Sequence, residues 1–148
     1  MYRKIMPTTW LLVGILLTVA LRLLLPVPAV VPRPWHLLGL IPLALGVVAN
    51  LSADGAFRRA ATTVKPYEEP SALIEAGAFR VTRNPMYLGF VLILLGVAAL
   101  LRAAAPFVVV PAFAILMDRG YIAHEERALA ERFGPRWEAY RGATRRWL

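Results

Sequence analysis

Two short polar clusters, separated by an apolar segment, carry side chains that could bind a charged ligand. The first is the stretch 83–89, which reads Arg-Asn-Pro-Met-Tyr-Leu-Gly, and the second is the acid pair Glu125 and Glu126. Carboxylates accept strong hydrogen bonds from hydroxyl and ammonium groups, and the free backbone N–H groups at the start of a helix favour an anion. The two clusters together predict a cofactor site built at a membrane surface.

The elements that must position these clusters are predicted by four apolar runs. The chain has 148 residues, of which 59% are hydrophobic, and these are gathered into runs, as is typical of a membrane protein. Since a span takes about 20 residues, the last two runs are short and need flanking residues or a thinner bilayer. The predicted fold is all-α and integral to the membrane, in a single domain. We expect its transmembrane helices over about 8–25, 35–53, 86–101 and 105–120.

The distribution of basic residues predicts the orientation. Most of the 17 lysines and arginines lie in the N-terminal tail, in the connecting loop 54–85 and in the C-terminal helical segment 121–148. The positive-inside rule then places both termini and the loop in the cytoplasm, at an inner membrane of bacterial or archaeal type. The net charge of +8 lies beside predicted membrane ends, where anionic headgroups attract it. Membrane lipids are therefore expected partners, and nucleic acid is not.

The count of metal-binding residues and the composition of the loop 54–85 allow two further predictions. With no cysteine and two histidines, the sequence predicts no metal site. The loop is long for so small a membrane protein, and such loops are usually functional or disordered, but its apolar residues argue against disorder. Within it we expect a short helix that is capped by Ser71 and stopped by Gly77.

The acid pair falls on a predicted amphipathic helix after the fourth run. Residues 122–133 read as a helix that ends at a Gly-Pro stop signal. At about 100° per residue, Glu126 falls inside the apolar stripe and Glu125 on its flank. A buried acid is costly without a partner, so the position of Glu126 favours a functional role. The ordinary alternative is a solvated helix face with one salt bridge, to Arg83 or Arg119.

The two motifs resemble a known superfamily. Arg-Asn-Pro-x-Tyr-x-Gly at 83–89, followed by Glu-Glu-x-x-Leu-x-x-x-Phe-Gly at 125–134 and by Tyr140, is similar to the isoprenylcysteine carboxyl methyltransferase and phospholipid methyltransferase superfamily of integral membrane enzymes. The resemblance runs over about 62–147. It implies a methyltransferase (EC 2.1.1.-) that uses S-adenosylmethionine and acts on a lipophilic acceptor.

The resemblance and the local chemistry together single out the site residues. We expect catalytic roles for Arg83, Tyr87 and Glu126. The residues expected to bind the cofactor are Gly77, Asn84, Pro85, Tyr87, Gly89, His124, Glu125 and Glu126. The aromatic residues that could line the adenine or acceptor pocket are Tyr67, Phe79 and Tyr87. Ordinary alternatives exist for several of these, because Arg83 suits lipid headgroups, Tyr87 the aromatic belt and Gly89 the packing of two helices.

The resemblance leaves the methyl acceptor open. The eukaryotic prenylcysteine enzymes have an arginine one turn before the acid pair, where this chain has Tyr121. The expected acceptor is lipophilic and isoprenylcysteine carboxylate-like. Because Tyr121 replaces an arginine that could seat the substrate carboxylate, the alternatives are a phospholipid amine, a quinone-like lipid and a small thiol. A non-enzymatic membrane subunit or transporter component is an alternative of another class. Against it, none of the four apolar runs holds a central acid, which an ion or proton path usually requires.

Overall fold

The computed structural model describes residues 5–62 and 71–148, and within these it is helical without a β-strand. The expectation of an all-α chain is confirmed. Three helices are long and apolar enough to cross a membrane, namely Pro7–Leu24, Trp35–Arg59 and Ala104–Phe133, and the shorter apolar helix Pro85–Leu101 has 17 residues. All four apolar runs of the sequence are therefore helical.

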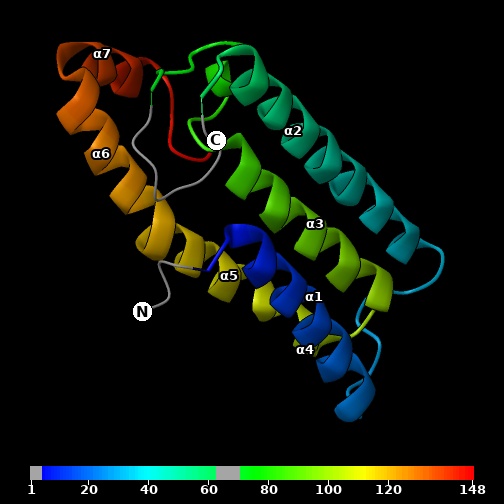
Figure 1. Ribbon diagram of the computed structural model, residues 1–148. Helices are drawn as coiled ribbons and strands as arrows, with labels where there is room; N and C mark the ends of the chain where they lie inside the picture. Colours follow the sequence, from blue (N-terminus) through cyan, green and yellow to red (C-terminus); the bar gives the residue numbers. More distant parts are fainter. Residues whose placement is uncertain (1–4, 63–70) are drawn as a thin grey trace.

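The helices follow the apolar runs, with two differences at their ends (Figure 1). The second run starts as a 3-10 turn, η2 (Trp35–Gly39), and continues to Arg59 instead of ending near residue 53. The fourth run does not end near residue 120, because a π-turn, η4 (Asp118–Ile122), carries it into the following helix. The helical path that starts in the fourth run ends only at Gly134, where the chain takes φ 47°. The α-helices are α1 (Pro7–Leu24), α2 (Leu40–Arg59), α3 (Pro85–Leu101), α4 (Ala104–Phe107), α5 (Val109–Met117), α6 (Ala123–Phe133) and α7 (Pro135–Ala143).

The loop before α3 differs from the expectation of a helix capped by Ser71. The hydroxyl of Ser71 instead donates to Thr62 Oγ1 over 2.8 Å, a contact that joins two distant parts of the loop. The ordered turn here is η3 (Gly77–Arg80), a 3-10 turn. Gly77 begins that turn rather than ending a helix, and its φ of 63° is a conformation that favours glycine. The predicted helix at 71–75 was therefore wrong, since the hydroxyl of Ser71 bonds Thr62, nine residues earlier, instead of capping a first helical turn.

Glycines bring α2 and α3 into close contact along their length (Figure 1). A Cβ atom placed on Gly46 would lie 2.4 Å from the carbonyl oxygen of Gly89, and one placed on Gly96 would lie 2.6 Å from that of Gly39. Neither distance admits a carbon atom, so the two backbones approach as closely as only glycine allows. Small residues serve this purpose in membrane helices, where apolar side chains gain little by leaving the lipid.

The other helices pack around α3 and fix its start. Leu94 of α3, Met117 of α5 and Ile122 of η4 are fully buried in one cluster, which extends to Tyr87 and Tyr121. At the far end of the bundle, the carbonyl of Arg102 accepts a hydrogen bond from the backbone of Val30 over 2.7 Å. Because Tyr87 belongs to the same buried cluster as Leu94, the start of α3 is held by the core.

The glycine contact leads to a prediction for stability. Gly46→Ala should lower the free energy of unfolding by about 1–3 kcal/mol, because the new methyl group meets backbone that cannot move aside. The matched control is Gly55→Ala in the same helix, where the nearest atom is the flexible end of Arg59 at 3.4 Å. That substitution should be neutral or slightly stabilising, since alanine favours a helix over glycine. Thermal unfolding in detergent measures both, and equal losses would contradict the close approach.

Candidate functional site

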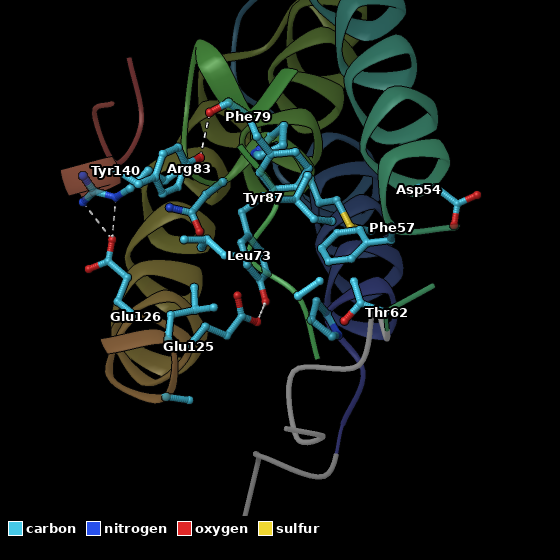
Figure 2. Close-up of a pocket in the computed structure, with 18 of the residues that line it drawn as sticks. Asp54, Phe57, Thr62, Leu73, Phe79, Arg83, Tyr87, Glu125, Glu126 and Tyr140 are labelled. Carbon is cyan, nitrogen blue, oxygen red and sulfur yellow. Dashed lines mark hydrogen bonds and ion pairs between the residues drawn. The ribbon is translucent and has the colours of Figure 1, made fainter. Parts of the chain in front are cut away.

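A cavity of about 330 Å³ lies at the end of the bundle where α3 begins (Figure 2). Its volume falls within the range of small-molecule sites, which is about 300–1,000 Å³. The start of α1, the end of α2, the loop before η3, the start of α3, and parts of α6 and α7 all contribute to the wall. Ligand-binding groups from separate segments of the sequence therefore converge here. The polar and charged side chains of the wall are Thr8, Asp54, Thr62, Arg83, Asn84, Tyr87, Glu125, Glu126 and Tyr140.

Glu125 faces the cavity and is held by Tyr87. The hydroxyl of Tyr87 donates a short hydrogen bond to Glu125 Oε1, and Figure 2 shows the two side chains pointing at each other. The ring of Tyr87 is fixed in turn by Tyr121, whose centroid is 6.2 Å away, and by Phe90, in an edge-to-face contact at 6.4 Å. Within residues 5–62 and 71–148, Glu125 makes no ion pair. Its carboxyl group therefore faces the cavity with its hydrogen bond to Tyr87, where a cationic or hydroxyl-bearing ligand could reach it.

Glu126 has a different environment from its neighbour. Its Oε1 accepts hydrogen bonds from Arg83 Nη2 at 2.8 Å and Nε at 3.1 Å, and the guanidinium of Arg146 bonds both of its oxygens. Adjacent residues on a helix point about 100° apart, so one acid faces the cavity while the other faces the C-terminal residues. Of the two explanations for Glu126, the structure contains the salt bridge with Arg83. Arg119 instead pairs with Asp118.

Arg83 joins three elements. Besides its pair with Glu126 of α6, its Nη1 donates to the carbonyls of Arg141, at 3.0 Å, and Thr144. Its guanidinium carbon also lies 5.7 Å from the ring centroid of Trp137 in α7, a cation–π contact. The side chain is only 9% exposed. The described contacts of Arg83 are therefore to the protein, although its side chain forms part of the cavity wall.

Asn84 and Pro85 stand where α3 begins, as expected, but Asn84 does not cap the helix with its side chain. Asn84 Nδ2 donates instead to the carbonyl of Arg146 over 3.0 Å. The backbone N–H of Asn84 donates to Thr82 Oγ1 over 3.1 Å. Asn84 and Pro85 both line the cavity, so the first turn of α3 is presented to it.

Other expected site residues lie apart from the cavity wall. Gly89 packs against Gly46 and Asn50, where a Cβ atom would lie 2.1 Å from Asn50 Nδ2, so its closeness serves the contact between α2 and α3. Gly77 belongs to η3 and His124 to the first turn of α6, and neither is part of the wall. Tyr67 is outside the described residues. Phe79 is part of the wall, in an edge-to-face contact with Phe57 at 5.6 Å.

The structure also brings in residues that the sequence did not single out for the site. Trp137 and Tyr140 of α7 line the cavity beside Leu73. Two signals were available. Tyr140 is part of the pattern that carries the resemblance, and the spacing of three residues puts both side chains on one helix face, although that spacing fits a membrane-surface helix equally well. Burial raises the pKa of Tyr140 to about 12, against the opposing effect of Arg83. Its hydroxyl therefore stays protonated and donates to the carbonyl of Phe79 over 2.7 Å.

A family model described as phospholipid methyltransferase matches residues 34–136, which is more than half of the chain. Neither curated proteins nor solved structures give a match. The matched region includes both motifs, and it confirms the superfamily that they resemble.

A buried and an exposed ion pair, Arg83 with Glu126 and Arg58 with Asp54, should differ in their contribution to stability. Breaking the pair between Arg83 and Glu126 with Arg83→Gln should lower the free energy of unfolding by about 3–5 kcal/mol, because a buried carboxylate loses a partner. Arg58→Gln breaks the pair with Asp54 at the same distance of 2.8 Å, but there Arg58 is 79% exposed. That loss should be at most about 1 kcal/mol. Thermal unfolding in detergent compares them, and similar losses would contradict the burial of Arg83.

Proposed function

The chain belongs to the phospholipid methyltransferase family, and we propose that it transfers a methyl group from S-adenosylmethionine to a lipid acceptor in the membrane. The observation that carries the proposal is the carboxylate of Glu125, which faces the cavity and has Tyr87 as its described partner. The apolar helices and the family both indicate an integral membrane location. The orientation with both termini in the cytoplasm is part of the proposal.

The residues of the cavity fit the cofactor's chemical groups. Glu125 would accept hydrogen bonds from the ribose hydroxyls or the ammonium group. The apolar and aromatic side chains of Leu73, Trp137 and Tyr140 would suit the adenine ring. The first turn of α3, at Pro85, presents the positive end of a helix, which would suit the cofactor's carboxylate.

The opposite end of the cavity suits a lipid. There the wall is formed by Met6 and Pro7 at the start of α1, by Phe57 near the end of α2, and by Phe90. Figure 2 shows Phe57 on one side of Tyr87, with Tyr140 and Glu126 on the other. An acceptor that enters from the bilayer side and a cofactor bound beside α7 would therefore meet near Tyr87 and Glu125.

The chemistry asked of the chain is mainly positioning. When bound, S-adenosylmethionine supplies a methyl group that is already attached to a good leaving group. The residues of the wall have to hold the acceptor in line with it and exclude water. Tyr87 orients the Glu125 carboxylate through its hydrogen bond. Where the acceptor loses a proton, this carboxylate is placed to take it. This assignment gives Glu125 the central role and leaves Glu126 and Arg83 to hold the wall.

The charges of the wall favour an amine acceptor over a carboxylate. Among the described lining residues Arg83 is the single cation, and it already donates to Glu126 and to two carbonyl oxygens. A carboxylate acceptor would have no cation of its own here and would lie near Glu125. An amine would meet a carboxylate instead, and a phospholipid acceptor agrees with the family's description. Of the acceptors left open by the sequence, we therefore favour the amine of a phospholipid.

Cofactor binding provides the first test of the function. Isothermal titration of the detergent-purified protein with S-adenosylhomocysteine should show saturable binding. Glu125→Gln should raise Kd by at least about tenfold, because one charge-assisted hydrogen bond contributes roughly 1.5–3 kcal/mol. The control is Arg127→Gln, an exposed position on the same helix, which should bind as the wild type does. Absence of binding by the folded wild-type protein, in lipid as well as in detergent, would support a non-enzymatic membrane subunit.

The acceptor class is tested by methyl transfer from labelled S-adenosylmethionine. Vesicles that contain phosphatidylethanolamine should become labelled in their lipid fraction, because the amine is compatible with the charge near Glu125. A prenylated cysteine with a free carboxylate should remain unlabelled under the same conditions. Labelling of the prenylcysteine alone would overturn the amine assignment while preserving the methyltransferase.

A further inference from the structure

The last residues of the chain fold back over the start of α3, and we call residues 144–147 the strap. The backbone N–H of Arg83 donates to the carbonyl of Arg145 over 2.9 Å. Thr82 Oγ1 donates to the carbonyl of Arg146 over 3.0 Å. The strap is therefore bonded through its backbone to the turn that leads into the proposed cofactor site.

The side chains of the strap bind a second surface. The guanidinium of Arg146 contacts both oxygens of Glu126 on α6, and its Nη1 lies 3.2 Å from Asp118 Oδ1 in the π-turn. Trp147 Nε1 also donates to Asp118 Oδ1, over 3.1 Å. The hydrogen bond to Glu126 raises the pKa of Arg146, so its charge persists at every physiological pH. Arg146 therefore connects Asp118 to the buried pair of Glu126 and Arg83.

We propose that Arg146 is a positioning residue of the site: it fixes Glu126, and through Glu126 it fixes Arg83, at the wall of the cavity. The inference rests on the proposed function, because the wall it supports is the cofactor's. Arg146 is not itself part of the cavity wall, so it acts through its partners. The family match covers residues 34–136, and the strap lies outside the matched residues.

The physical reason lies in the geometry of Glu126. Its side chain is 12% exposed, and Oε2 receives its hydrogen bond from Arg146 Nη2. Without that donor, a buried carboxylate oxygen loses its partner, and the side chain gains by turning toward water. The turn would draw Arg83 away from Trp137, over whose ring it lies. Since Trp137 and Arg83 both form the wall, the shape of the cavity would change.

Cofactor binding by a set of variants tests this role. Arg146→Gln should raise Kd for S-adenosylhomocysteine by about tenfold, which corresponds to about 1.4 kcal/mol. Arg146→Lys should lie between Arg146→Gln and the wild type, because lysine is a point charge without the planar fork. Arg145→Gln is the matched control and should leave Kd unchanged, since the exposed side chain of Arg145 forms no ion pair within the described residues.

A double-mutant cycle separates positioning from a general loss of stability. If Arg146 acts through Glu126, then Glu126→Gln and the double variant with Arg146→Gln should have the same Kd, because the second change finds nothing left to disturb. Additive losses, or wild-type binding by Arg146→Gln, would overturn the proposal. Thermal unfolding of each variant shows that the comparison is made between folded proteins.

A measurement without ligand separates this inference from the proposed function. Because the chain has no cysteine, spin labels can be attached at Leu148→Cys beside the strap and at Glu131→Cys on α6, both exposed positions. The distance distribution should be narrow with wild-type Arg146 and with Arg145→Gln, and broad with Arg146→Gln. An unchanged distribution would overturn the claim that Arg146 holds the strap. If the wild type binds no S-adenosylhomocysteine but the distribution still broadens, the proposed function fails and the anchoring by Arg146 stands.

Discussion

The ion pair between Arg83 and Glu126 is the interaction on which the site depends. It joins the start of α3 to α6, and it lies where the apolar helices end and polar groups are needed. Two charges that are this little exposed are stable only because every oxygen and most nitrogens find partners. Arg146 supplies partners for Glu126, and the carbonyls of Arg141 and Thr144 supply partners for Arg83, while Asp118 pairs with Arg146 in turn. The local need for charge compensation thus explains why the C-terminal residues return to the bundle.

The pairing of Glu126 with arginines also leaves Glu125 as the acid that faces the proposed ligand site. Glu126 is enclosed by two arginines, whereas Glu125, its neighbour, faces a cavity with Tyr87 as its described partner. Tyr87 is itself held by the core, because its ring lies against Tyr121 and Phe90. A carboxylate that faces the cavity and is held from behind by a rigid side chain suits the binding of a cation or of hydroxyl groups. The different environments of Glu125 and Glu126 are therefore a result of how the helices and the C-terminal residues pack.

Much of this arrangement can be predicted from the sequence, and the exceptions have identifiable causes. The apolar runs predicted the helices, and the pair of motifs predicted the superfamily. Gly89 illustrates an ambiguity, because a glycine on a helix can admit a ligand or a second backbone. The structure places Gly46 and Asn50 against it. Ser71 illustrates another, since its hydroxyl can cap a helix or bond a distant residue, and here it bonds Thr62. The local sequence is compatible with both outcomes at each position, and contacts with residues outside the local segment select one.

The sequence by itself determined that the chain is helical, that it is built for a membrane, and that it carries the motifs of a methyltransferase family. These follow from the length and hydrophobicity of the runs and from residues close together in sequence. Only the tertiary structure decided that Glu125 faces the cavity while Glu126 is paired. The helical period gives their relative directions, but which direction leads to a cavity depends on where Arg83 and Arg146 lie. Those residues are 43 and 20 positions away in the chain, and a contact over such a separation is set by the packing of the whole bundle.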